Sequence, residues 1–307
     1  MNAAASGKDM ENERRGGFMC TALALDRGKR WFCRTLDIEE PYGETVVLAP
    51  RLFRWRFLYG GERRESLSML GMAHLHGGLP LYYDAMNECG LAMAALRFAG
   101  EAVYQRAEPG RACVASFELI PWLLGRCRNI GEARELLSSI VITDDAVSGA
   151  LSTTPLHWLL SDGKESLAIE PLEMGLSVFD ATYGVLTNSP SYAEQIKNPA
   201  LRVLSDNGAE GLPGDFSSPS RFVRMAYVAK NAKEIATPDR CFSLMDAVAV
   251  PCGCARGLGG RLISTRYTAC MDLSAGVYHF TTDTCRTRRE AHLFRQDLET
   301  ADLIFPL

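Results

Sequence analysis

A hairpin pattern near the start of the chain constrains the fold more than any other feature. Two apolar runs, 19–25 (MCTALAL) and 31–37 (WFCRTLD), are separated by Asp26-Arg27-Gly28-Lys29, a segment rich in turn-forming residues. We therefore expect two adjacent antiparallel strands. Cys20 lies at the beginning of the first one, directly after Met19.

The segment before Met19 has a different character. Residues 1–18 are polar and charged, and they lack the apolar stretch of a secretion signal. A propeptide, an upstream start codon and a disordered tail all fit this composition. If residues 1–19 are absent from the mature chain, Cys20 carries a thiol and a free α-amine. An α-amine, with a pKa of about 7.7–8.0, accepts the thiol proton near neutral pH far better than a lysine does.

A cysteine nucleophile of this kind also needs charged neighbours, because only the thiolate is reactive. Arg34 and Asp37, in the second apolar run, are candidates to lower the pKa of the thiol and to hold the amine. Strand parity would place these two side chains on opposite faces. We expect the strand to end between them, with Asp37 in the following turn.

Composition and charge exclude several classes of protein. The chain has 307 residues, of which 47% are hydrophobic and 23% charged, as in an ordinary globular protein of one large or two small domains. A net charge of −4 argues against binding to nucleic acid or to an anionic membrane. No apolar run approaches the roughly 20 residues of a membrane span. The 10 cysteines are scattered and indicate reduced thiols in the cytoplasm.

Hydrophobic periodicity and turn residues predict the order of elements. One asparagine, Asn129, is expected to cap a helix with Glu132 in a capping box. His157 is expected to be a core histidine with a satisfied ring. The predicted strands are 45–50, 66–74, 91–98 (after a turn at 82–90), 156–161, 166–171, 176–179, 183–187, 265–273 and 276–282; the predicted helices are 113–126, 129–139, one that ends near 234, and 238–250.

Several motifs in one order resemble the choloylglycine hydrolase family, which comprises bile salt hydrolases and penicillin V acylases among the N-terminal-nucleophile hydrolases. The first match is Met-Cys-Thr at 19–21 followed by Arg-Thr-Leu-Asp at 34–37. The others are Asp-Ala-x-Asn-Glu-x-Gly-Leu at 84–91 with Ala-x-Leu-x-Phe at 94–98, Thr-Asn-Ser-Pro at 187–190, Leu-Pro-Gly-Asp at 212–215 and Tyr-Thr-x-Cys-Met at 267–271.

The resemblance implies an α+β fold, a four-layer αββα sandwich of the N-terminal-nucleophile hydrolase type. Residues 20–307 would form a single domain, and residues 1–19 would be a tail or propeptide absent from the mature enzyme. A homo-oligomer is implied as well, the homotetramer being one form known in the family.

The resemblance also implies an amide hydrolase that works through an acyl-enzyme on Cys20. Arg34 would support the thiolate, Asp37 would orient the amine, and Arg221 would balance charge around the nucleophile. Asn188, at a strand end before Ser-Pro, presents an amide N–H as an oxyanion donor requires, an effect worth about 3–4 kcal/mol.

Arg97 departs from the family pattern. Bile salt hydrolases commonly carry asparagine at this position, and penicillin acylases can carry tyrosine. The backbone N–H of Arg97 would still hold the oxyanion, whereas the side chain, which contacts substrate in the family, would alter the preference for acyl group or amine.

The substrate implied is a small-molecule amide, first of all a glycine- or taurine-conjugated bile salt. Penicillin V or another N-acyl amide is the alternative within the same chemistry. An unprocessed, non-catalytic homologue that only binds a ligand is an alternative of another class. No cofactor or metal is expected, because Cys252-Gly253-Cys254 has no second pair of ligands nearby; a cysteine-rich metal or redox protein has little support.

Overall fold

Two large antiparallel sheets form the centre of the protein. The computed structural model describes residues 19–148, 153–205, 210–257 and 260–306. Sheet 1 has the strand order β14(Val185–Leu186), β1(Met19–Asp26), β2(Arg30–Ile38), β16(Leu262–Asp272), β17(Val277–Thr282), β18(Arg289–His292), with β15(Ala255–Arg256) also paired to β16. Sheet 2 has the order β13(Gly175–Asp180), β12(Ser166–Leu172), β11(Leu156–Ser161), β8(Ala92–Arg97), β7(Leu79–Asn87), β6(Met69–His76), β3(Thr45–Ala49).

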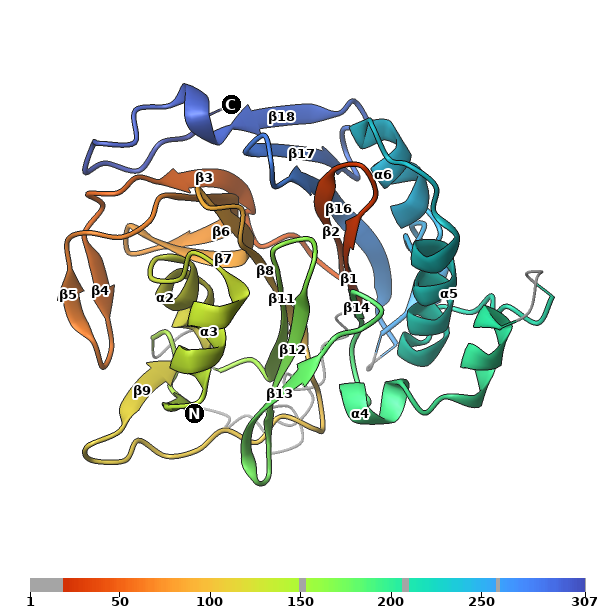
Figure 1. The fold of residues 1–307 in the computed structure, drawn as a ribbon, viewed down its shortest axis with the longest axis horizontal. Helices are drawn as coiled ribbons and strands as arrows, with labels where there is room; N and C mark the ends of the chain where they lie inside the picture. Colours follow the sequence, from red (N-terminus) through yellow and green to blue (C-terminus); the bar gives the residue numbers. More distant parts are fainter. Residues whose placement is uncertain (1–18, 149–152, 206–209, 258–259, 307) are drawn as a thin grey trace, which may run out of the picture.

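Helices cover the outer faces of both sheets. In Figure 1, α2 and α3 lie against sheet 2, whereas α5 and α6 lie against sheet 1. The helices are α2(Leu119–Leu124), α3(Ile130–Leu137), α4(Tyr192–Gln195), α5(Ser218–Asn231) and α6(Pro238–Met245), with the 3-10 turns η1(Ser116–Glu118), η2(Pro199–Leu204) and η3(Leu293–Arg295). Two small sheets complete the structure, the parallel pair β9(Ala112–Ala115) and β10(Ile140–Thr143) and the antiparallel pair β4(Trp55–Phe57) and β5(Gly61–Arg63). The predicted four-layer αββα sandwich is confirmed.

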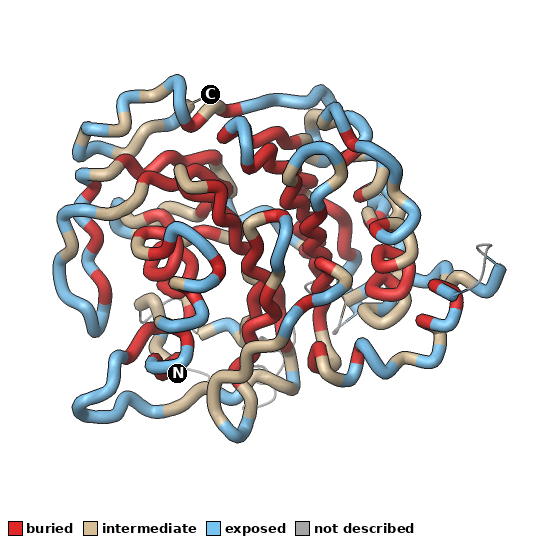
Figure 2. Tube along the Cα trace, in the orientation of Figure 1, coloured by how far each residue is buried: buried red, intermediate tan, exposed pale blue. Residues whose placement is uncertain are grey.

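Burial follows these layers. Figure 2 shows the most continuous buried segments along the strands of the two sheets. One core cluster combines residues of both sheets, including Leu23 of β1 and Leu159 of β11, and lies partly between them. A second cluster, which includes Leu160 of β11, lies between sheet 2 and the helices α2 and α3. The side chains of adjacent residues in β11 thus point to opposite faces of sheet 2 and belong to different core clusters, because side chains alternate along a strand.

The expected hairpin is present, with a longer second strand than predicted. Gly28 has φ +83° in the turn between β1 and β2, a conformation that favours glycine. In the ladder, Cys20 is opposite Leu36 and Met19 is opposite Asp37. The expectation that Asp37 follows the strand is therefore wrong: pairing on both sides, with β1 and with β16, extends β2 to Ile38.

Two other element predictions are wrong for reasons of long-range pairing. The segment predicted as a helix from 113 begins as β9, which pairs with β10, and α2 starts only at Leu119. Pro121 therefore lies in the first turn of α2, where its missing N–H costs no helical hydrogen bond. Residues 82–87, predicted as part of a turn, belong to β7. The cap of α3 is as expected, because Asn129 accepts a hydrogen bond from the Glu132 N–H.

Within the residues that the structure describes, none of the helices is both long and apolar enough to cross a membrane.

Candidate active site

Cys20 is the second residue of β1, the strand between β14 and β2 in sheet 1. Its side chain is only 2% exposed. Its backbone nitrogen donates a hydrogen bond of 2.8 Å to Oδ1 of Asn188. The nitrogen that would become an α-amine after removal of Met19 therefore already has an acceptor.

Asn188 follows β14, the neighbour of β1, and connects Cys20 to sheet 2. Its Nδ2 donates to the Arg97 carbonyl at 2.8 Å. Its Oδ1 accepts from Arg221 Nη2 at 2.7 Å in addition to the Cys20 N–H. Both ends of the amide are thus fixed, which sets the orientation of the side chain.

Arg221 reaches the same place from the first turns of α5. Its Nη1 donates to the Cys20 carbonyl at 2.5 Å and to Thr21 Oγ1 at 2.7 Å. Nε donates to the Phe216 carbonyl at 3.0 Å, which anchors the guanidinium to the loop before the helix. Arg221 is fully buried, and its hydrogen bonds hold both β1 and Asn188.

Arg34 and Asp37 approach Cys20 from opposite faces of sheet 1, as their places in one strand require. Arg34 lies on the face toward sheet 2, where its Nη1 donates to the Tyr83 carbonyl at 2.9 Å. Asp37 lies on the other face and accepts hydrogen bonds from Thr265 Oγ1 at 2.6 Å and Thr35 Oγ1 at 3.3 Å. Both residues are fully buried.

Burial and charge act against each other on the thiol. Burial raises the pKa of Cys20, and the two arginines Arg34 and Arg221 lower it while Asp37 raises it further. A hydrogen bond from the Arg97 backbone N–H also lowers the pKa of this thiol. Burial raises the pKa of Asp37 itself to about 6, despite the opposing charges of Arg221 and Arg34.

The sequence-predicted residues Cys20, Arg34, Asp37, Asn188, Arg221 and Arg97 thus converge on one place. Arg97, the last residue of β8, brings its backbone N–H to the sulfur. Its side chain is 6% exposed, and burial lowers its pKa while the charges of Cys20, Tyr42 and Glu39 raise it.

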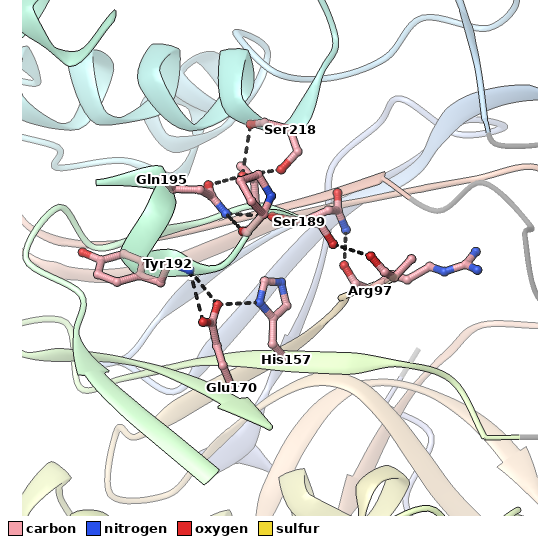
Figure 3. A network of polar contacts seen from close by, with 11 residues as sticks. Arg97, His157, Glu170, Ser189, Tyr192, Gln195 and Ser218 are labelled. Atoms are coloured by element: carbon pink, nitrogen blue, oxygen red, sulfur yellow. Dashed lines mark hydrogen bonds and ion pairs between the residues drawn. The ribbon is translucent and has the colours of Figure 1, made fainter. Parts of the chain in front are cut away.

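A network behind Asn188 was not predicted from the sequence (Figure 3). Gln195 of α4 donates from Nε2 to the carbonyls of Asn188 and Pro190, both at 2.7 Å. Its Oε1 accepts from Thr187 Oγ1, which also contacts Ser218 at the start of α5. Gln195 is 1% exposed. A buried glutamine in a four-residue helix carries no sequence signal that reveals such a role.

His157 belongs to the same network. Its Nδ1 lies 3.0 Å from Glu170 Oε1, and Glu170 accepts hydrogen bonds from the Tyr192 N–H (Figure 3). Its ring stacks on Phe98 with centroids 4.2 Å apart. The core position is as expected, but Nε2 has no hydrogen-bond partner among the described residues, so the ring is only half satisfied.

A cavity of about 680 Å³ lies at the opposite end of β1, lined by residues such as Leu25, Lys164, Tyr183 and Lys230. Cys20 is not among its lining residues. The described part of the chain contains no group of three or more histidine, cysteine or acidic side chains arranged to hold a metal ion.

Comparison with known proteins gives a consistent result. The family model "Linear amide C-N hydrolases, choloylglycine hydrolase family" matches residues 20–305. The chain is 33% identical to the bile salt hydrolase/transferase of Lactiplantibacillus plantarum, over 94% of this chain and 97% of that protein. It is 31% identical to the bile salt hydrolase/transferase of Clostridium perfringens, over 86% and 89% of the two chains.

Solved structures agree with the fold. A variant of conjugated bile acid hydrolase from Clostridium perfringens superimposes with a TM-score of 0.86 at 27% identity, over 93% of this chain and 96% of that one. The penicillin V acylase of Agrobacterium tumefaciens has a TM-score of 0.77 at 21% identity, over 93% and 90% of the chains, a likeness of fold.

Proposed function

Because the chain belongs to the choloylglycine hydrolase family of linear amide C–N hydrolases, we propose that it cleaves the amide bond of glycine- or taurine-conjugated bile salts. The names of its relatives support this substrate class, since the proteins of Lactiplantibacillus plantarum and Clostridium perfringens are bile salt hydrolases/transferases. The observation that carries the chemistry is the position of Cys20, whose nitrogen is held by Asn188 while the charges of two buried arginines lower the pKa of the thiol.

Cys20 is the proposed nucleophile. Removal of residues 1–19 frees its α-amine, which takes the thiol proton as Sγ attacks the amide carbonyl. The same amine then returns the proton to the leaving nitrogen as the C–N bond breaks. Water, activated by the amine, finally cleaves the thioester and releases the acid. Each step uses one general base that lies on the nucleophile itself.

The surrounding residues have distinct roles in this proposal. Arg34 supports the thiolate, and Arg221 neutralises charge around the Cys20 backbone while it holds Asn188. The Arg97 N–H and Asn188 Nδ2 are the proposed oxyanion donors, since the Arg97 N–H contacts the thiol and Asn188 accepts a hydrogen bond from the Cys20 nitrogen through Oδ1. Asp37 orients the amine from the other face of the strand. Asn188 Oδ1 acts with it, since it accepts a hydrogen bond from the Cys20 nitrogen.

Experiments can distinguish this function from two alternatives. Penicillin V or another N-acyl amide would use the same residues, and Arg97 is the position that separates these substrates. A ligand-binding homologue would retain residues 1–19 and have no turnover. We also propose a single domain over residues 20–307 and a cytoplasmic location. A homo-oligomer is proposed as well, and sedimentation of the purified protein tests this oligomeric state.

Steady-state hydrolysis of glycocholate, taurocholate and penicillin V by the purified protein tests the function. We expect kcat/KM for a bile salt to exceed that for penicillin V by at least about tenfold, a difference of about 1.4 kcal/mol in transition-state binding. Cys20→Ala should abolish turnover of every substrate. The intact mass of active enzyme should correspond to a chain that starts at Cys20.

Hydrolysis of penicillin V alone would show that the substrate class is wrong, and turnover by Cys20→Ala would exclude the mechanism. Arg97→Asn then tests the specificity position. If the Arg97 side chain contacts substrate, the ratio of kcat/KM between bile salt and penicillin V changes in the variant; an unchanged ratio removes that role.

A further inference from the structure

Arg34 is held by an acidic group from the other sheet. Asp84, on β7 of sheet 2, faces Arg34 of β2 across the interior, with 3.4 Å between Asp84 Oδ2 and Arg34 Nη1. Both side chains are fully buried. A buried guanidinium requires a counter-ion, because an isolated charge in the protein interior is very costly.

Two tyrosines complete the support. Tyr267 of β16 donates its hydroxyl to Asp84 Oδ2, and Tyr278 of β17 donates to Asp84 Oδ1 at 2.6 Å. The guanidinium carbon of Arg34 also lies 5.5 Å from the centre of the Tyr267 ring, within reach of a cation–π interaction. Three strands of sheet 1 and one of sheet 2 therefore meet at this carboxylate.

A β-bulge in β7 aims these groups at Arg34. The register between β6 and β7 shifts so that Met72 pairs with Asp84 and Ala73 with Tyr82, which leaves Tyr83 as the extra residue. Because of this shift, Tyr82 belongs to the core of the outer layer while Asp84 points toward sheet 1. The carbonyl of the bulged Tyr83 accepts from Arg34 Nη1 at 2.9 Å.

A second bulge, in β16, brings Tyr267 to the same side. Thr265 pairs with Asp37 and Tyr267 with Leu36, so Arg266 is the extra residue. Without the bulge, Thr265 and Tyr267 would share one face of the sheet. With it, Thr265 contacts Asp37 on one face and Tyr267 contacts Asp84 on the other. The two acids near Cys20 thus receive separate partners from one strand.

We propose that Asp84, supported by Tyr267 and Tyr278, is a positioning residue that fixes the Arg34 guanidinium beside Cys20. Of the guanidinium nitrogens, only Nη1 contacts this support. Nε and Nη2 are buried and have no hydrogen-bond partner among the described residues, so these donors remain for the thiolate or a bound substrate. The role of Arg34 rests on the proposed function; its attachment to Asp84 does not.

Charge supports the same assignment. Burial raises the pKa of Asp84, and Arg34, Tyr267 and Tyr278 oppose that rise. Arg34 is the charge that lowers the pKa of the Cys20 thiol most, ahead of Arg221, whereas Asp37 raises it. A displaced Arg34 therefore weakens the main support of the thiolate.

The test measures the pH dependence of Cys20 alkylation by iodoacetamide, together with kcat and KM, in Asp84→Asn, Tyr278→Phe and the wild type. Peptide mapping must identify Cys20, because Cys241 is a second buried thiol, and hydrogen bonds from Cys270 and Cys33 lower its pKa. For Asp84→Asn we expect the Cys20 profile to move to higher pH by about one unit. We expect kcat to fall about 10- to 100-fold with a smaller change in KM.

Matched controls separate positioning from loss of stability. Asp272→Asn removes another buried acid, which pairs with Lys29. Tyr82→Phe removes a buried hydroxyl from the core cluster between sheet 2 and the helices α2 and α3. Both controls should leave the alkylation profile unchanged. Should Asp84→Asn fail to fold, Tyr278→Phe should show a smaller shift in the same direction.

An unchanged profile in the folded Asp84 and Tyr278 variants, or a shift to lower pH, would overturn the proposal. A shift to lower pH would mean that Asp84 only screens Arg34. The alkylation profile requires no substrate. If the wild type hydrolyses none of the amides but Asp84→Asn still moves the profile upward, the proposed function fails and the positioning role stands.

Discussion

Asp37 is a fully buried acid, and burial disfavours its charged form. Its pKa of about 6 compares with 3.8 for a free side chain, because burial outweighs the hydrogen bonds and the nearby arginines. Since the folded-state pKa is the higher one, protonation of Asp37 favours folding. This stabilising contribution is complete below about pH 4 and is lost as the pH rises through about 6.

Asp37→Asn should therefore stabilise the protein at neutral pH and inactivate it. The difference between the two pKa values corresponds to about 3 kcal/mol in the free energy of unfolding at pH 7. Denaturant titrations at pH 7 and pH 4 measure this gain, which should largely disappear at pH 4. An equal loss of stability at both pH values would contradict it, and full activity of the variant would remove Asp37 from the mechanism.

The six candidate residues of the motifs lie close together in the structure, and their catalytic roles stay a prediction. The expected end of β2 before Asp37 is wrong, because Asp37 lies inside the strand. The end of a strand depends on its neighbours: β16 continues to pair with β2 as far as Ile38. Such a partner lies more than 200 residues away in the chain, and no local pattern around 34–37 reveals it.

At the scale of elements, the short helix α4 holds Asn188 in place through Gln195. Gln195 binds the carbonyls of Asn188 and Pro190 and so fixes the turn between β14 and α4 (Figure 3). Because Asn188 Oδ1 accepts a hydrogen bond from the Cys20 N–H, this turn determines where the amide of Asn188 lies relative to Cys20, the proposed nucleophile.

Gln195→Leu should reduce kcat/KM for the preferred amide about 10- to 100-fold, because the oxyanion donor is no longer held at its place. The comparison is Ser161→Ala, which also removes hydrogen bonds of a buried side chain, to Glu165 and Ser166. Both variants should lose stability, but only Gln195→Leu should lose activity in the folded state. Equal kcat/KM values for the two would refute the role of Gln195.

Elements built from local patterns were predicted well, and those that depend on distant partners were not. The hairpin of β1 and β2 and the Asn129 cap depend on adjacent residues. The strand β9 depends on pairing with β10, and the bulge at Tyr83 depends on the register of β6. The backbones of β6 and β7 approach closely at Gly71, where a Cβ atom would lie 2.0 Å from the Asp84 carbonyl oxygen.

For the whole molecule, the shared core predicts that the two sheets unfold together. The cluster that combines both sheets includes Leu159, and its neighbour Leu160 belongs to the outer core of sheet 2. Neither sheet can unfold alone without exposure of the apolar surface of the other. The four-layer arrangement itself was predicted from the resemblance to a family; periodicity alone gives only the mixture of strands and helices.

Leu159→Ala and Leu160→Ala should each lower the midpoint of one common thermal transition. Each should reduce the free energy of unfolding by about 2–5 kcal/mol. Calorimetry of the wild type and both variants checks this. Two separate transitions, with Leu160→Ala affecting only one of them, would contradict a single domain.

The place of Met19 in β1 has a consequence for how the enzyme matures. The Met19–Cys20 peptide bond lies inside a paired strand, with Met19 opposite Asp37 and Cys20 opposite Leu36. Cleavage by another enzyme requires an accessible segment, which a strand within a sheet does not offer. If another enzyme is to remove residues 1–19, the cut must therefore come while β1 is still unpaired. Such removal would compete in time with folding, and a chain that folds first would keep Met19 joined to Cys20 and lack the free α-amine.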